Sequence, residues 1–158
     1  MTRIGKWLTN FTLNNLGFVG LTRFIHRSGQ HGKVKLWIHY YLFPFKSVIN
    51  LAWSPDTDYE DNDEMRFCHK RGIKYITYFW GAGRPPIWRE LEEASALIDI
   101  LPVPVWVHCE GGKDRTGGLI GRWKQLHGYT MKEIRKDFKE YGEPSSEWIK
   151  YLNEAGNA

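Results

Sequence analysis

Residues 105–117 read VWVHCEGGKDRTG, and this stretch decides the fold of the chain. It places an apolar strand, a glycine-rich turn and the start of a helix in immediate succession. Backbone N–H groups at a helix N-terminus point outward without partners, and the adjacent Gly111 and Gly112 let several amides curve around one anion. Arg115 adds a planar guanidinium that can bind two oxygens of a phosphate group at once. The segment therefore predicts a phosphate-binding loop.

Cys109 stands at the base of this predicted loop, directly after the strand. A helix N-terminus and nearby cations favour the thiolate form of a cysteine, and the thiolate is the nucleophile. A thiolate beneath a bound phosphate is placed for in-line attack on phosphorus, which gives a cysteinyl-phosphate that water then hydrolyses. This chemistry needs neither a metal ion nor a cofactor. No metal-binding spacing is found among the histidines outside the loop, which are His26, His31, His39, His69 and His127.

Three other interpretations of the segment are a surface glycine turn, a nucleotide-binding P-loop and a buried structural cysteine. The nucleotide motif G-x-x-x-x-G-K-[ST] fails at two positions, because Val107 stands where its first glycine belongs and Asp114 where its serine or threonine belongs. The other two interpretations do not explain why a strand, His108, paired glycines, Thr116 and a helix occur together. We therefore retain the phosphate-binding loop.

The segments on either side of the loop alternate between strand-like and helix-like patterns. Apolar runs predict strands at 24–26, 47–51, 73–79 and 103–107, the last with Pro104 near its start or on a sheet edge. Helical spacing and end signals predict helices at 34–43, 59–71, 87–100, 116–127, 131–141 and 145–155. This alternation predicts an α/β fold, with a central, mostly parallel sheet flanked by helices.

The composition is typical of a globular protein. The chain has 158 residues, of which 42% are hydrophobic and 25% charged, and we expect one domain over 1–158 with an N-terminal extension over 1–20. Asn10, Asn14 and Asn15 interrupt any apolar run near the N-terminus, which argues against a signal peptide or a membrane span. Two cysteines without a secretory segment fit a reducing compartment. We therefore expect a soluble, cytoplasmic protein.

The motif His-Cys-x5-Arg-Thr-Gly, at residues 108–117, resembles the signature of protein tyrosine and dual-specificity phosphatases. The resemblance extends over about residues 24–130 and includes the segments 27–30 and 47–51 and the loop before Pro85 and Pro86. It implies a fold like that of the dual-specificity phosphatases. By position it also implies four roles: Cys109 as nucleophile, Arg115 as phosphate clamp, Thr116 as the hydroxyl that assists phosphoenzyme breakdown, and His108 as a support behind the thiolate.

The general acid of that family is usually an aspartate in a loop before the cysteine, often followed by glycine and proline. Here the loop reads AGRPP at 82–86, so the resemblance places Ala82 at the position of the acid, 27 residues before Cys109. Alanine cannot donate a proton. Either the chain is an engineered Asp-to-Ala trap or it takes its acid from elsewhere. Asp114 is the leading substitute, because the resemblance of this loop to those of myotubularin-type and Sac-type lipid phosphatases implies an acid role at that position. Its alternative role is to cap the N–H groups at the start of the helix.

Five loop residues are also predicted to contact the substrate, and they are His108, Glu110, Gly111, Gly112 and Lys113. Lys113 matches the lysine of Gly-Lys-x-Arg loops in phosphoinositide phosphatases, which leaves a lipid substrate open. Glu110 departs from the cationic residue at that place in the best-known lipid phosphatase, and a carboxylate there repels a multiply phosphorylated inositol. The balance favours a phosphoprotein.

Several residues outside the loop have two interpretations. Cys68 either forms a reversible disulfide with Cys109, as the resemblance to phosphoinositide phosphatases implies, or is a buried core residue. Arg84 and Arg89 either meet the substrate or are solvated. Trp80 and Trp88 either line the entrance or pack beside the prolines. The remaining acidic candidates form a solvated turn and helix start, and they are Asp56, Asp58, Asp61 and Asp63.

The leading interpretation is a phosphomonoester hydrolase that acts on phosphorylated protein. The alternatives are a phosphoinositide phosphatase, an RNA 5′-phosphatase of the same fold, and a phospho-ligand binding module that has lost its acid. The net charge of +4 favours anionic partners, but the charges are scattered, so nucleic acid is not favoured. Retention of both Cys109 and Arg115 favours an enzyme, because a pure binding module has no need of a thiolate.

Overall fold

The computed structural model describes residues 15–19, 24–52, 62–81 and 83–155. Within these residues the centre of the molecule is a sheet of order β1-β2-β5-β3-β4. Its strands are β1 (Gly17–Phe18), β2 (Ile25–Gly29), β5 (Val105–Cys109), β3 (Ser47–Asn50) and β4 (Lys74–Thr77). The last four run parallel to one another, whereas β1 pairs antiparallel with β2. The carboxyl-terminal ends of the four parallel strands therefore share one edge of the sheet, with Cys109 at the centre of that edge.

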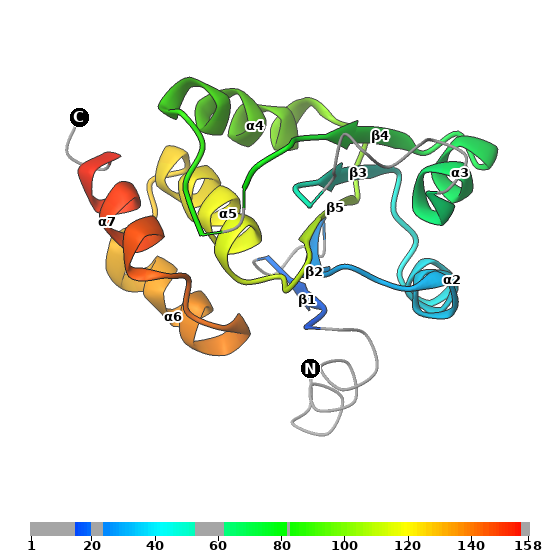
Figure 1. Ribbon diagram of the computed structural model, residues 1–158, viewed down its shortest axis with the longest axis horizontal. Helices are drawn as coiled ribbons and strands as arrows, with labels where there is room; N and C mark the ends of the chain where they lie inside the picture. Colours follow the sequence, from blue (N-terminus) through cyan, green and yellow to red (C-terminus); the bar gives the residue numbers. More distant parts are fainter. Residues whose placement is uncertain (1–14, 20–23, 53–61, 82, 156–158) are drawn as a thin grey trace.

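Helices cover both faces of the sheet (Figure 1). On one face lie α2 (Lys33–Leu42) and α3 (Asp63–Lys70). On the other lie α4 (Trp88–Ile100) and α5 (Asp114–Leu126), and α6 (Met131–Tyr141) and α7 (Ser146–Ala155) pack against α5. Among the described residues, no helix combines the length and apolar composition needed to cross a membrane.

The sheet separates two apolar clusters. Side chains of β5 point alternately to the two faces and therefore belong to different clusters. Val105, Val107 and Cys109 join the cluster beneath α4 and α5, whereas Trp106 joins the cluster beneath α2 and α3. Successive side chains of a strand point to opposite faces, so His108 lies on the face of Trp106. The nucleophile candidate and its histidine neighbour therefore face opposite helical layers.

Glycines inside α5 allow α7 to pack closely against it. A Cβ atom added at Gly118 would overlap the ring of Trp148, and one added at Gly121 would lie 2.9 Å from Leu152. Glycine in a helix interior costs stability of about 1 kcal/mol relative to alanine. The buried Trp148 and Leu152 offset that cost, because both are 0% exposed and belong to the core under α5.

The predicted α/β fold with a mostly parallel sheet is confirmed, and each predicted helix is present within a few residues of its expected bounds, although residues 59–61 of the second lie outside the described residues. The strand predictions differ in detail at their ends, as at 73–79, where β4 covers only Lys74–Thr77, and one strand was not predicted. The strand at 24–26 extends to Gly29, because Gly29 still pairs with Cys109. The last strand begins after Pro104, which has no N–H to donate to the ladder. The two-residue β1 was not predicted, since so short a segment has no period to detect.

Candidate active site

Cys109 is the last residue of β5, and α5 begins five residues later at Asp114. The Cys109 side chain is buried, and the Gly112 N–H donates to its Sγ over 3.2 Å. A cavity of about 310 Å³ opens above the loop between them. Its lining residues are Gly83, Cys109, Glu110, Gly111, Lys113, Asp114 and Arg115. The structure thus brings the predicted nucleophile, loop and arginine together around one pocket.

Arg27 of strand β2 and Gln30, the residue after that strand, hold the loop by donating to carbonyl groups of the loop. The Gln30 N–H donates to the Glu110 carbonyl over 3.0 Å, and Arg27 Nη2 donates to the Gly112 carbonyl over 2.9 Å. In a trans peptide the N–H points opposite to the C=O, so the N–H groups of Gly111 and Lys113 point away from β2. Both residues line the pocket. The loop therefore presents N–H groups to the cavity, as an anion-binding cradle requires.

Gly112 is required by this close approach of the loop to β2. It has a φ of 70°, and a Cβ atom there would lie 2.7 Å from the Ser28 carbonyl oxygen. Only glycine adopts this backbone conformation without strain while meeting a neighbouring backbone so closely. The second glycine of the pair is therefore a structural requirement of the cradle.

Arg27 supports the loop, and the sequence did not reveal this contact. It is 0% exposed, it lies 4.7 Å from the centre of the Tyr141 ring, and it donates to the loop. Burial lowers the pKa of its guanidinium, and the carboxylate of Asp137 opposes that shift. The sequence placed Arg27 only within a stretch of family resemblance. The sequence offered no clear signal for this role, because the strand reads IHRSG and Ile25 is its only large apolar residue.

Arg115 is anchored by carbonyl groups from two other segments. Its Nη1 donates to the Leu51 carbonyl over 3.1 Å and to the Trp80 carbonyl over 3.0 Å. Its Nη2 lies 3.7 Å from Oε2 of Glu110, whose side chain is 82% exposed. The anchored guanidinium is held at the pocket, and an incoming anion would compete with Glu110 for it.

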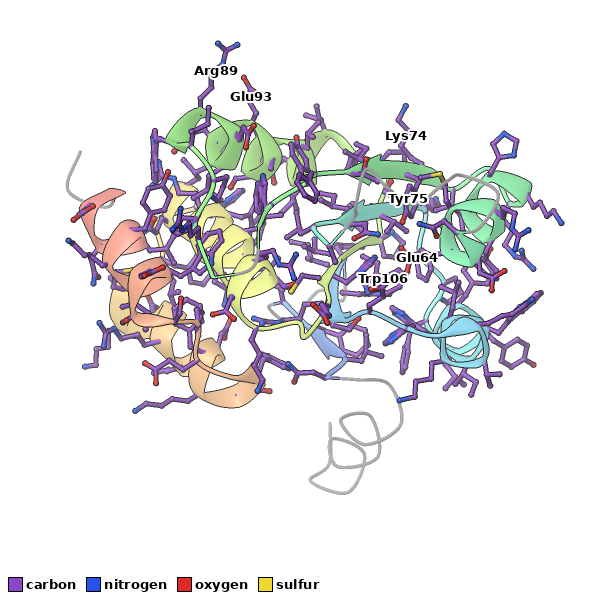
Figure 2. The ribbon with its side chains drawn as sticks, viewed as in Figure 1. Glu64, Lys74, Tyr75, Arg89, Glu93 and Trp106 are labelled. Carbon is purple, nitrogen blue, oxygen red and sulfur yellow. The ribbon has the colours of Figure 1, made fainter. Side chains whose placement is uncertain are left out.

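A buried polar network stands behind the loop on the opposite face of the sheet. His108 Nε2 and Glu64 Oε1 are 2.8 Å apart, and the Tyr75 hydroxyl donates to the same oxygen over 2.7 Å. Asn50 Nδ2 donates to the Tyr75 hydroxyl over 2.8 Å. Figure 2 shows Glu64 and Tyr75 close together above Trp106, on which the His108 ring stacks at a centroid distance of 4.3 Å. Burial, followed by the Glu64 carboxylate, raises the pKa of Tyr75.

This network reaches both parts of the site. It holds His108, the residue before Cys109, and the Asn50 Oδ1 accepts from the Ala52 N–H over 2.8 Å. Asn50 thereby shapes the turn that carries the Leu51 carbonyl, which accepts from Arg115. His108 was predicted among the substrate-contacting residues, but its ring is 0% exposed and does not line the pocket. Glu64 was not singled out, because a first-turn glutamate is usually a solvated helix-start residue.

Asp114 lines the pocket and also bonds elsewhere. Its Oδ1 accepts from the N–H of Ser145, the residue before α7, over 2.6 Å. The carboxylate thereby connects the loop to the start of that helix. Thr116 is fully buried, and its Oγ1 has no hydrogen-bond partner among the described residues. Arg84 is exposed and does not line the pocket, whereas its neighbour Gly83 does. Ala82 lies outside the described residues.

The remaining predictions concern two tryptophans and a group of aspartates. Trp80 is 3% exposed and packs against Tyr78 and Trp148, and Trp88 packs on Tyr151 and the Arg122 guanidinium, so both tryptophans are packing residues. Asp63 pairs with Arg66 over 2.6 Å at the exposed start of α3, as expected. Asp56, Asp58 and Asp61 lie outside the described residues.

Of the two interpretations of Cys68, the fold supports the buried core residue. Cys68 belongs to the cluster beneath α2 and α3, and Cys109 to the cluster beneath α4 and α5, so the sheet stands between the two thiols. Both cysteines are free. Burial, followed by the Glu64 charge, raises the pKa of the Cys68 thiol, which opposes thiolate formation. Cys68 is therefore a core residue.

Comparison with known proteins agrees with this geometry. Residues 60–155 match the sequence profile described as Tyrosine phosphatase family. The OCA1 protein of Mycosarcoma maydis, grouped by name with the tyrosine-protein phosphatases, is 29% identical over 127 residues, which are 73% of either chain. Inositol diphosphatase DSP3 of Arabidopsis thaliana is 25% identical over 60% of this chain and 47% of its own. The chain thus spans about half to three quarters of these relatives.

Solved structures share the fold at lower identity. The core catalytic domain of the PP-IP phosphatase SIW14 from S. cerevisiae superposes with a TM-score of 0.68 at 19% identity, over 89% of this chain and 84% of the other. Tk-PTP in its active form gives a TM-score of 0.73 at 20% identity, over 90% and 97% of the two chains. At this identity the likeness establishes the fold.

Proposed function

The chain belongs to the tyrosine phosphatase family and is a phosphatase of that fold, and on this premise we propose that it hydrolyses phosphate esters through a cysteinyl-phosphate on Cys109. The observation that carries the proposal is the pocket itself. A buried thiol that accepts an N–H from Gly112 over 3.2 Å lies beneath loop N–H groups and an anchored arginine. These donors would stabilise the phosphate oxygens as negative charge develops on them.

In the first proposed step, the Cys109 thiolate attacks phosphorus. The S–P bond forms, and the bond to the leaving oxygen breaks with its electron pair on that oxygen. Arg115 and the N–H groups of Gly111 and Lys113 would hold the three non-bridging oxygens as charge develops on them. In the second step, water attacks phosphorus and gives up a proton to a base or to solvent, the S–P bond breaks, and inorganic phosphate leaves. Thr116, next to Arg115, is proposed to assist this second step.

The leaving oxygen needs a proton when the leaving group is strongly basic. Two positions are candidates for the donor of this proton. Ala82, at the position where the family resemblance puts the acid, cannot supply one. Asp114 lines the pocket, but its carboxylate accepts from the Ser145 N–H over 2.6 Å and is thereby engaged with the backbone just before α7. We therefore propose that turnover of phosphotyrosine or alkyl phosphates is slow, whether the alanine is native or an engineered trap.

A second candidate substrate follows from the same observation. When a diphosphate is cleaved, the leaving group is itself a phosphate, which departs as an anion without first taking a proton. An enzyme with alanine at the acid position is therefore less impaired on phosphoanhydrides than on esters. Lys113 lines the pocket and adds a positive charge for a polyanionic substrate, although Glu110 at the rim opposes it. Inositol diphosphatases among the relatives agree with this candidate.

The testing experiment is a time course of p-nitrophenyl phosphate hydrolysis, because this leaving group barely needs an acid. We expect sustained release by the wild-type chain and none by Cys109→Ser. Absence of release with Cys109 intact would instead favour a phospho-ligand binding module. A panel of phosphotyrosine peptide, inositol diphosphate, phosphoinositide and 5′-triphosphorylated RNA then ranks the substrates. Preference for the phosphopeptide supports the protein phosphatase, and preference for the diphosphate supports the second candidate.

A further inference from the structure

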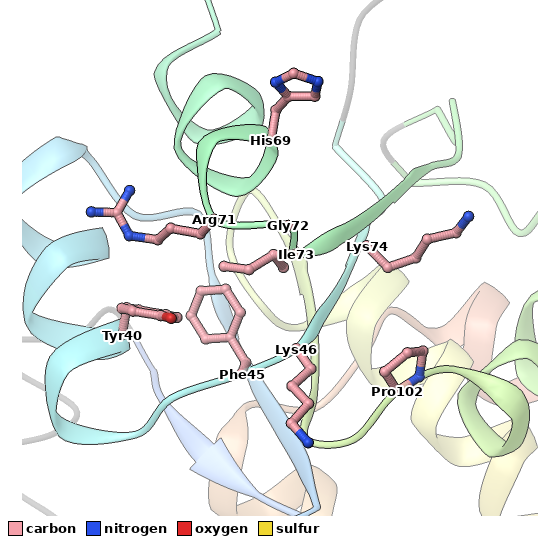
Figure 3. A pocket seen from close by; sticks show the side chains of 9 residues that line it. All are labelled: Tyr40, Phe45, Lys46, His69, Arg71, Gly72, Ile73, Lys74 and Pro102. Carbon is pink, nitrogen blue, oxygen red and sulfur yellow. The ribbon is translucent and has the colours of Figure 1, made fainter.

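A second cavity, of about 480 Å³, opens at the amino-terminal edge of the sheet (Figure 3). It lies where the chain enters β3, β4 and β5. Its lining residues are Tyr40, Phe45, Lys46, His69, Arg71, Gly72, Ile73, Lys74 and Pro102. Because Cys109 is at the carboxyl-terminal end of β5, this cavity is separated from the phosphate-binding loop by the length of the strand.

The floor of the cavity is apolar and its rim is basic. Phe45 and Ile73 are only 2% and 7% exposed, so the floor is part of the folded core. Arg71 is held at the rim by two aromatic rings, with its guanidinium 4.2 Å from the Trp37 centroid and 3.9 Å from that of Phe67. Such contacts fix the guanidinium in place without neutralising it.

Among the described residues, no carboxylate lines this basic rim. None of the residues that line the cavity is acidic. Lys46 and Lys74 are exposed, their backbones are joined by a 3.0 Å hydrogen bond, and neither forms an ion pair with a described residue. Some cations elsewhere in the chain do have such partners, as Arg122 has in Glu92 and Arg89 in Glu93. An unneutralised group of cations around a concave surface attracts anionic ligands from solution.

The directions of the side chains indicate what kind of anion fits. In Figure 3 the tips of Lys46, Arg71 and Lys74 point outward to different sides of the cavity rather than toward one centre. Three spread charges suit a ligand whose negative charges are also spread, and they are poorly arranged for one small anion. The hollow between them suits an apolar side chain, whereas a flat bilayer surface would reach the rim and leave the floor uncovered.

We propose that this cavity docks an acidic protein segment, with one apolar side chain on the floor formed by Phe45 and Ile73 and flanking carboxylates beside Lys46, Lys74 and Arg71. The segment belongs to a partner or to a protein substrate. Docking at this edge leaves the pocket above Cys109 free. The site and its ligand class are independent of the reaction at Cys109.

The experiment measures binding of a short fluorescein-labelled peptide of Asp and Glu residues with one central Phe, by fluorescence anisotropy at low and at physiological salt. We expect Lys46→Glu/Lys74→Glu to weaken binding about tenfold or more, since two favourable charge contacts become repulsive. The matched control is Lys132→Glu/Lys139→Glu, which makes the same change in net charge on the exposed surface of α6. It should weaken binding less than about twofold. Both variants should hydrolyse p-nitrophenyl phosphate as the wild type does, which also verifies their folding.

Each other outcome would overturn the proposal. Equal losses in the two charge-reversal variants would mean that the peptide responds only to net charge. Equal affinity for a peptide with Ser in place of the central Phe would exclude the apolar floor from the interaction. Binding to phosphatidylserine vesicles or to inorganic phosphate, without binding to the peptide, would assign the rim to a different ligand.

Discussion

Glu64 is buried on the face of the sheet opposite to Cys109, where it contacts His108, the residue before Cys109. Its Oε1 meets His108 and Tyr75 at 2.8 and 2.7 Å, and Asn50 at 3.4 Å, while its side chain is only 4% exposed. We expect Glu64→Ala to lower the free energy of unfolding by about 2–4 kcal/mol, because it leaves buried donors without an acceptor. Urea unfolding measures this loss.

A role in positioning requires a second measurement on the same residue. Glu64→Gln keeps the shape and one acceptor oxygen, so it should recover part of the stability. If Glu64 also positions the loop, both variants lower kcat for p-nitrophenyl phosphate under conditions in which they are fully folded. Wild-type kcat in folded Glu64→Ala would restrict Glu64 to a structural role.

Ala82→Asp tests the position that the family resemblance assigns to the acid. The restored acid should raise turnover of a phosphotyrosine peptide by roughly 10²-fold or more, because general acid catalysis typically supplies 10²–10⁴. Turnover of p-nitrophenyl phosphate should change much less, since its leaving group needs little protonation. Steady-state kinetics with both substrates gives the comparison. An equal effect on both, or none on either, contradicts the assignment.

At the scale of elements, the packing of α2 and of His31, just before it, against β5 should make stability depend on pH. His31 stacks on Trp106 at a centroid distance of 5.1 Å, and burial, followed by the His108 and Lys35 charges, lowers the pKa of His31 to about 3. The unfolded chain binds a proton at this histidine near pH 6.5, whereas the folded chain does not. Its contribution to stability is therefore complete above about pH 6.5 and is lost as the pH falls toward 3.

We expect this histidine to add a slope of up to about 1.4 kcal/mol per pH unit below pH 6. His39, which has a pKa lowered by burial and by His31, adds to it. Urea titrations at several pH values between 7 and 4 measure the slope. In His31→Phe the slope of the unfolding free energy against pH should be shallower than in the wild type. The carboxylates are the same in both proteins, so their contribution to the slope cancels in the comparison. Identical slopes in the two proteins would show that His31 does not titrate on unfolding.

The contact between α5 and α7 depends on the absence of a side chain at Gly118. Alanine is the better helix former by about 1 kcal/mol, yet we expect Gly118→Ala to destabilise by about 1–3 kcal/mol, because the new Cβ atom would displace the Trp148 ring. Gly81→Ala is the matched control, since a Cβ atom at Gly81 meets nothing within 4 Å. It should change stability by less than about 0.5 kcal/mol. Thermal or urea unfolding distinguishes the two.

Elements were predictable from the sequence where local signals determine them. The β5–loop–α5 unit follows from an apolar run, paired glycines and a helix start, all within thirteen residues. Contacts made by tertiary packing were not predictable. Arg27 and Glu64 serve the loop from a neighbouring strand and from the opposite helical layer, and no spacing in the sequence indicates either. The carbonyls of Leu51 and Trp80 that anchor Arg115 carry no residue-type signal, because every residue has one.

At the scale of the whole molecule, the sheet gives the protein two edges with different properties. The carboxyl-terminal edge ends in the pocket above Cys109, and the amino-terminal edge ends in the basic cavity beside Lys46 and Lys74. A ligand at one edge does not contact the other. If a protein substrate uses both, tethering at the basic cavity would raise its local concentration at the pocket without altering the chemistry there.

The same sheet also governs how the protein would respond to oxidants. The chain has two cysteines, and they lie on opposite faces, so a sulfenic acid formed on Cys109 by peroxide has no second thiol of its own molecule to condense with. We expect peroxide-inactivated protein to regain activity only when glutathione or dithiothreitol is added, and mass spectrometry to find a Cys109–glutathione adduct rather than an internal bridge. The duration of inactivation is then set by the thiol supply of the surroundings, because the fold provides no resolving thiol.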